Sequence, residues 1–255
     1  MIIILCEGTT DAILIGYFLT KYNYAYSKEK DSPVKIPTPK RNEEINWYKK
    51  TDSDPWIAIW TVGGFDRLGN GLFKILSRNQ IERNKSRRFT RIILFCDRDQ
   101  RSEQEFQDLA ASWEKPPEFE CEKMAATGSW SKYKMTSINR TPAEEMSGEL
   151  LFVAIPPDAK GNLETFLLEA LANENENDRH IVEMSKKYIN EIPDTPYLTK
   201  NRFREKAQLG VALSTFSPDW VFSETDKRLT NVDWKNVSDV NSVFHFFDDI
   251  IPANK

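Results

Sequence analysis

Three acidic residues stand at the ends of two short apolar runs, and their positions point to metal chemistry. Residues 92–96 are continuously apolar and lead into Asp97 and Asp99, which are separated by one residue. Residues 2–6 form a similar run that ends at Glu7. Apolar runs of this length are typical of strands buried on both faces, and parallel neighbours would bring the three acids to one edge of a sheet. Because crowded carboxylates repel one another, we expect a hard divalent cation, Mg²⁺ or Mn²⁺, among them.

The strands that would carry these acids alternate with helical segments. Further apolar runs lie at 56–62 and 150–155, and helical spacing of apolar residues follows each run. This alternation predicts a parallel sheet with right-handed crossovers and a ligand site at the carboxyl ends of its strands. The sequence therefore predicts an α/β fold with a four-stranded, mainly parallel sheet flanked by helices. The stretch 24–54 is interpreted as a long excursion from this core. The stretch 115–147 has two interpretations, a surface loop or β-hairpin, or basic and aromatic residues that hold a single strand of nucleic acid.

The last third of the chain has a helical pattern. A polar break at 174–178 is interpreted as the end of the core, which predicts one domain over 1–175 and an α-helical C-terminal extension over 176–255. Within this extension, Lys206 is the residue that we expect to supply a cation to a transition state.

Composition describes an ordinary globular protein, with 40% hydrophobic and 29% charged residues. A net charge of −4 argues against a protein that coats DNA by charge alone, but not against an enzyme with a local basic path. Cys6, Cys96 and Cys121 lack Cys-x-x-Cys spacing and are interpreted as small hydrophobic residues rather than metal ligands. The sequence holds no signal peptide and no apolar run of transmembrane length, so we expect a cytoplasmic protein with no membrane contact.

Two motifs resemble the Toprim domain, which is shared by topoisomerases, bacterial primases, small ribonucleases and OLD-family nucleases. A strand ending in Glu-Gly-x-x-Asp matches Glu7, Gly8 and Asp11, and a strand ending in Asp-x-Asp matches Asp97 and Asp99. The resemblance covers roughly the first two-thirds of the chain. It implies a Rossmann-like sheet of four strands, a Mg²⁺ site and phosphodiester chemistry.

A third segment, Gly161-Asn162-Leu163-Glu164, is similar to the Gly-x-Leu-Glu segment of stand-alone Toprim-like proteins and OLD nucleases. The similarity implies that Glu164 binds a second metal ion, with Asp11 as the other candidate. Each of these two acids also lies in the first turn of an expected helix, where the helix dipole favours a negative charge without any metal. Whether one or two ions bind stays open.

Glycines and arginines near the expected strand ends are candidates for phosphate contacts. Gly8 permits a tight turn from strand to helix, which lets a phosphate approach the backbone. The pair Gly63-Gly64 has two interpretations, a tight turn or a phosphate contact, and the resemblance favours the second. Arg98 lies inside the Asp-x-Asp motif and Arg101 follows it by two residues, and both are predicted to contact phosphate.

These observations predict a divalent-metal-dependent nuclease acting on DNA or RNA. Asp97 and Asp99 would bind the ion, and Glu7 would share it or move a proton as general acid or base. The sequence has no G-x-x-x-x-G-K-[ST] motif, so an ATPase or other defence partner of the OLD kind would be a separate chain. The resemblance implies a role in phage defence or repair. The alternatives are a non-catalytic Toprim-like module that binds nucleic acid or protein, and a primase-like nucleotidyl transferase.

Overall fold

The computed structural model of the chain describes residues 1–28, 31–36, 43–51, 55–122, 128–138, 143–157, 160–193, 195–218 and 243–250. Its contacts divide the chain into two compact units. Residues 1–97 and 101–157 form the first, here called the sheet unit, and residues 98–100 and 158–255 form the second, the helical unit. The domains predicted over 1–175 and 176–255 stay a prediction.

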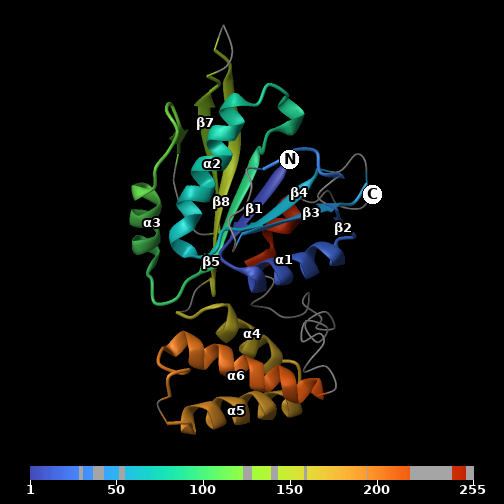
Figure 1. Cartoon of the computed structure of the whole chain (residues 1–255), viewed down its shortest axis with the longest axis vertical. Helices are drawn as coiled ribbons and strands as arrows, with labels where there is room; N and C mark the ends of the chain where they lie inside the picture. The colour runs from blue at the N-terminus through green and yellow to red at the C-terminus, as the bar shows by residue number, and fades with distance from the viewer. Residues whose placement is uncertain are drawn as a thin grey trace. The chain divides into compact units, whose positions relative to one another are not determined.

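The sheet unit is built on an eight-stranded mixed sheet, in the order β2-β3-β4-β1-β5-β8-β7-β6 (Figure 1). Its strands are β1 (Ile2–Cys6), β2 (Ala25–Ser27), β3 (Glu44–Lys49), β4 (Ile57–Thr61), β5 (Arg91–Asp97), β6 (Glu120–Cys121), β7 (Trp130–Thr136) and β8 (Glu145–Ile155). The neighbours β4, β1, β5 and β8 pair in parallel, and all other pairings are antiparallel. In Figure 1 the ladder of β7 and β8 extends beyond the other strands.

The prediction of a four-stranded, mainly parallel sheet is therefore wrong. Four further strands join this sheet: β2 and β3 in 24–54, the predicted excursion, and β6 and β7 in 115–147, the predicted loop or β-hairpin. Few residues of these outer strands are buried, and in β7 buried and exposed residues alternate, so they lack the continuous apolar run that marks a strand buried on both faces.

Helices cover both faces of the sheet. α2 (Leu68–Ile81) and α3 (Glu103–Ser112) bury Leu72 and Phe106 in one hydrophobic cluster with Leu5 of β1 and Leu94 of β5. α1 (Thr9–Lys21) contacts β4, and its buried residues lie outside that cluster, which places it on the other face. Two short 3-10 helices, η2 (Phe65–Arg67) and η3 (Lys85–Arg87), complete the described helical segments of this unit.

The helical unit contains α4 (Leu163–Ala172), α5 (Glu176–Glu191), α6 (Asn201–Phe216) and α9 (Phe246–Ile250). The first three pack against one another, as Figure 1 shows. Across the described residues of both units, no helix has the length and apolar character needed to cross a bilayer.

Candidate active site

The structure brings Glu7 and Asp97 together at one edge of the sheet. β1 and β5 pair in parallel with Cys6 opposite Phe95, so the residues that follow or end these strands are neighbours. The carboxylate of Glu7 accepts a hydrogen bond from the backbone N–H of Asp97, with 2.9 Å between Oε1 and N. Both acids are partly exposed, so a ligand can reach them from solvent.

The pKa of the buried Cys96 thiol reflects both its burial and the charges at this edge of the sheet. Burial raises the pKa of Cys96 well above its usual value, and the negative charges of Glu7, Asp97 and Asp11 raise that pKa further. The positive charge of Arg101 acts in the opposite direction. The carboxyl ends of β1 and β5 therefore carry concentrated negative charge, which Arg101 partly offsets.

Arg101 is held by an aromatic partner that the sequence did not reveal. Its guanidinium carbon lies 3.9 Å from the ring centroid of Phe65, which is a cation–π contact. Phe65 directly follows the Gly63-Gly64 turn at the end of β4. The sequence shows an aromatic residue after the glycine pair, but nothing in it indicates that this ring contacts an arginine 36 positions later.

The three candidate glycines differ in what their backbones do. The N–H of Gly8 donates to Asp11 Oδ2 at 2.8 Å, which gives Asp11 a helix-capping role at the start of α1. The N–H of Gly63 donates to the carbonyl of Glu7 at 3.1 Å. Gly64 has φ +130°, and a Cβ built there would meet no described atom within 4 Å. Gly64 therefore offers an open approach to a ligand.

The second acid of the Asp-x-Asp motif belongs to the helical unit. Asp99 has a left-handed backbone with φ +52°, a conformation that Asp adopts more readily than most residues. Its carbonyl accepts a hydrogen bond of 2.8 Å from the N–H of Gly161. The Cα of Asp99 can lie at most about 7 Å from that of Asp97, because only two peptide units separate them. Arg98, between the two acids, is buried.

Glu164 and Lys206, predicted to serve metal binding and the transition state, form an ion pair with each other. Glu164 is buried in the first turn of α4, whereas Lys206 on α6 is half-exposed. A second contact also joins the start of α4 to α6, because the side-chain amide of Asn162 donates a hydrogen bond to the carboxylate of Glu205. The structure thus shows a structural role for both side chains within the helical unit, and their predicted functional roles stay predictions.

Oxygen ligands at the sheet edge suit a hard divalent ion. Within the described ranges, no three His, Cys, Asp or Glu side chains are gathered closely enough to bind a metal ion by themselves. Mg²⁺ commonly takes only one or two carboxylates and completes its shell with water and substrate phosphate. Glu7 and Asp97 are two partly exposed acids at this edge, with the Glu7 carboxylate bonded to the Asp97 backbone, and a site of two carboxylates matches that habit.

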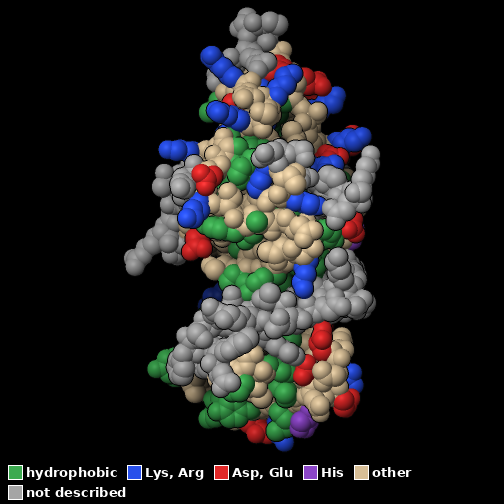
Figure 2. Space-filling model, turned by 90° about the vertical axis from the view of Figure 1, so that its right-hand side faces the viewer, with side chains coloured by type: hydrophobic (Ala, Val, Ile, Leu, Met, Phe, Trp, Pro, Cys, Tyr) green, Lys and Arg blue, Asp and Glu red, His purple; other side chains and the backbone are tan. Residues whose placement is uncertain are grey.

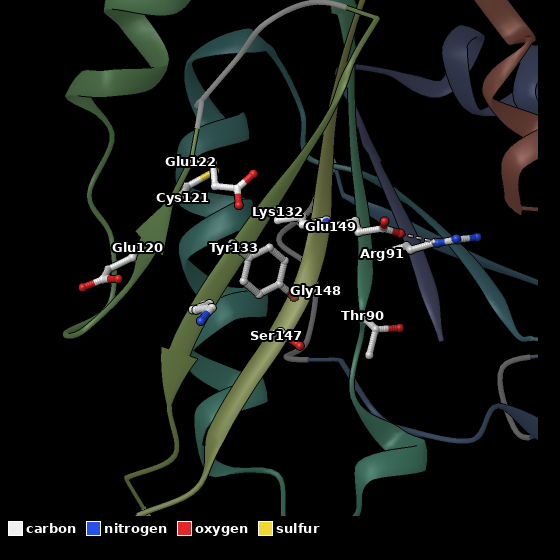
Figure 3. A pocket seen from close by; sticks show the side chains of 11 residues that line it. Thr90, Arg91, Glu120, Cys121, Glu122, Lys132, Tyr133, Ser147, Gly148 and Glu149 are labelled. Carbon is white, nitrogen blue, oxygen red and sulfur yellow. Dashed lines mark hydrogen bonds and ion pairs between the residues drawn. The ribbon is translucent and has the colours of Figure 1, made fainter.

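A pocket of about 650 Å³ lies at the opposite end of β5, away from the acid pair. Figure 3 shows Tyr133 among its lining side chains, with Arg91 paired to Glu149 at 2.8 Å. The Tyr133 hydroxyl donates to the carbonyl of Phe89 at 3.1 Å. The lining charges have both signs, and Arg91 and Lys134 form ion pairs across strands with Glu149 and Glu145, so this pocket does not add to the acid site.

Surface charges are mixed on the face seen in Figure 2. Lys and Arg side chains alternate with Asp and Glu over the sheet unit and do not form one continuous basic patch there. Any contact with nucleic acid on this face must therefore depend on a few local cations.

Comparison with known proteins identifies a family whose function is unknown. No curated protein and no solved structure matches the chain. A family described as "protein of unknown function (DUF3226)" matches residues 1–242, and the chain therefore belongs to this family.

Proposed function

We propose that the chain is a Mg²⁺- or Mn²⁺-dependent nuclease of the Toprim type. The observation that carries this proposal is the hydrogen bond between Asp97 N–H and the Glu7 carboxylate, which holds two partly exposed acids at the ends of adjacent parallel strands. The resemblance of the surrounding residues to the Toprim motifs gives further support.

In this proposal Glu7 and Asp97 hold the ion, with Asp99 and Asp11 as further candidates for its coordination. A bound Mg²⁺ or Mn²⁺ would neutralise phosphate charge and lower the pKa of an attacking water. Glu7 is also a candidate to accept or return a proton, because its partly exposed carboxylate lies beside the Asp97 backbone at the strand ends. Arg101, fixed over Phe65, would orient a phosphate oxygen next to the acids.

The partners in this proposal follow from the same chemistry. The substrate is DNA or RNA, and a separate ATPase or other defence protein would act as a partner chain. A cytoplasmic location belongs to the proposal as well.

Cleavage assays with single- and double-stranded DNA and RNA test this function. We expect the wild-type chain to cut at least one substrate when Mg²⁺ or Mn²⁺ is present and none with EDTA. Asp97→Asn and Glu7→Gln remove one negative charge each while keeping an oxygen that can accept a hydrogen bond, and each should lower the rate about 100-fold or more. Asp108→Asn is the matched control, because Asp108 is an exposed acid on α3.

A melting curve for each variant separates loss of chemistry from loss of folding. If the wild-type chain cuts none of the four substrates, or if the two site variants cut as fast as Asp108→Asn, the nuclease proposal fails. A non-catalytic binding module then becomes the better explanation, and binding of labelled oligonucleotides in EDTA would test it.

A further inference from the structure

A small polar pocket lies between β4 and the start of α2 in the sheet unit. Its volume is about 70 Å³, roughly that of two water molecules or of one small tetrahedral ion. Trp60 of β4 and Val62, which follows that strand, line the pocket. Gly71 lets α2 lie close to the strand end, since a Cβ at Gly71 would be 3.0 Å from the side chain of Val62. The next residue after Val62 is Gly63, whose N–H bonds to Glu7, so the pocket adjoins the candidate active site.

Two buried polar atoms that line this pocket have no hydrogen-bond partner among the described residues: Nε1 of Trp60 and Oε2 of Glu43. Trp60 is 1% exposed and Glu43 is 9% exposed, so water outside the pocket does not satisfy them. A buried donor or acceptor without a partner is destabilising, because the group has lost its hydrogen bond to water and gained no replacement. Glu43 is held here by its neighbour Glu44, whose N–H donates to the hydroxyl of Thr61 at 2.8 Å. The pocket therefore offers one fixed donor and one fixed acceptor.

Cations on α2 complete the lining. Arg67, Asn70 and Lys74 are spaced by three and four residues and so share one face at the start of the helix. Lys74 Nζ lies 5.4 Å from the ring centroid of Trp60. In the part of the chain that the structure describes, neither Arg67 nor Lys74 forms an ion pair. Two positive charges, an indole N–H and the positive end of the helix dipole all favour an anion.

Glu43 restricts which anion can bind. Its unpartnered oxygen needs a hydrogen-bond donor, and its negative charge repels an anion that brings none. Sulfate and an internal phosphodiester carry no proton near neutral pH, whereas hydrogenphosphate carries one. A phosphate monoester, whose second ionisation lies near pH 6, can also carry one.

We infer that this pocket binds a tetrahedral oxyanion that carries a proton, either inorganic hydrogenphosphate or the terminal phosphate of a polynucleotide. The indole N–H, Arg67 and Lys74 donate to its oxygens, and its O–H donates to Glu43. No bond is made or broken in this step. The polynucleotide part of the inference rests on the proposed nuclease function, and it would make the enzyme selective for phosphorylated ends over the interior of a strand.

Calorimetric titration of the full chain with phosphate and with sulfate tests the inference, because the two ions match in shape and nearly in charge. EDTA is present throughout, so the acid site and its metal do not contribute. We expect phosphate to bind at least about tenfold more tightly than sulfate, the ratio that one satisfied donor gives. Lys74→Gln should weaken phosphate binding about tenfold. Lys21→Gln, an exposed lysine at the end of α1, should leave it unchanged.

Glu43→Gln distinguishes this pocket from any other cluster of cations. A glutamine amide donates as well as accepts, so the variant should bind sulfate as tightly as phosphate. The inference is overturned if the wild-type chain binds neither ion, which would mean that the pocket holds only ordered water. It is also overturned if the wild type binds both ions equally, or if Glu43→Gln keeps the preference for phosphate.

Oligonucleotides separate the two sources of phosphate. A single strand with a terminal phosphate should displace inorganic phosphate, and the same strand with a terminal hydroxyl should not. Failure of both strands to compete would refute the polynucleotide part. The nuclease proposal would be unaffected by that result, because the cleavage assay tests it separately.

Discussion

Replacing Glu7 separates a structural contact from metal binding in a single residue. Glu7→Ala removes both the hydrogen bond to Asp97 N–H and the negative charge. Glu7→Gln removes the charge but keeps an oxygen at the end of a side chain of the same length. The two variants therefore differ mainly in one hydrogen bond.

The structure sets the size of each effect. A hydrogen bond to a charged group contributes about 1.5–3 kcal/mol, and since Glu7 is only partly buried we expect Glu7→Ala to lower the free energy of unfolding by about 1–2 kcal/mol. Glu7→Gln should stay within about 0.5 kcal/mol of wild type without metal, because the lost charge also relieves repulsion from Asp97 and Asp11. With Mg²⁺ at 100 times its dissociation constant, wild type should gain about 2.7 kcal/mol.

Thermal unfolding in EDTA and in a Mg²⁺ series measures these differences. For a unit of this size, 2.7 kcal/mol corresponds to a rise in Tm of about 5–10 °C. Wild type and the control Asp108→Asn should show this rise, and Glu7→Gln should show little of it. An equal rise in wild type and Glu7→Gln would refute the assignment of Glu7 to the metal, and no rise in wild type would refute the metal site itself.

Two further predictions concern the packing that supports the sheet, and urea unfolding measures both. The carbonyl of buried Phe89 accepts hydrogen bonds from Asn79 and Tyr133, so Asn79→Ala combined with Tyr133→Phe should cost about 1–3 kcal/mol more than the sum of the single changes. Additive costs would contradict the shared acceptor. Gly148→Ala should destabilise by about 1–3 kcal/mol, because its Cβ would lie 2.4 Å from the Tyr133 ring. Gly210→Ala, on α6 with no described atom within 4 Å, should stabilise by about 0.5–1 kcal/mol, and similar effects of the two changes would refute this reasoning.

Burial on both faces explains which strands the sequence revealed. The apolar runs at 2–6, 92–96 and 150–155 coincide with β1, β5 and the end of β8. In β1, for example, every residue is buried. The outer strands gave a weaker signal. In β7 the buried Ser131, Tyr133 and Met135 alternate with exposed lysines, a pattern of period two that marks a half-exposed strand. The stretch 115–147 as a whole lacks clear periodicity, which favours the prediction of a surface loop or a β-hairpin there.

The candidate site could be predicted only where covalent order determines position. Glu7 and Asp97 each follow directly from an apolar strand, so parallel pairing alone brings them to one edge. The pairing of Glu164 with Lys206 joins positions 42 residues apart, and the cap that Gly8 donates to Asp11 depends on backbone geometry. The ion pair does not follow from residue type and spacing, whereas the capping contact agrees with the first-turn position expected of Asp11.

The small polar pocket shows the same limit. Arg67 and Lys74 have helical spacing after a glycine turn, which is a readable signal for a phosphate contact. Glu43 lies in a stretch that was interpreted as an excursion from the core, and its place opposite Val62 is set by the pairing of β3 with β4. A polar group becomes functional here through burial, which the sequence does not record.

Local charge rather than net charge decides whether such a chain can bind a polyanion. At physiological salt, exposed charges more than about 8 Å apart are largely screened, so the net charge of −4 contributes little at the strand ends. Near these strand ends, Arg101 contacts the ring of Phe65, and Arg67 follows Phe65 by two residues in the sequence. Lys74 lies further along, within α2. Three cations engage about three phosphates, and each phosphate released from its counterions contributes about −0.7 to the salt slope for a single strand. If the chain binds a strand here as proposed, its affinity should therefore fall only shallowly with salt concentration, and specificity would come from the proposed metal site and from the strand end.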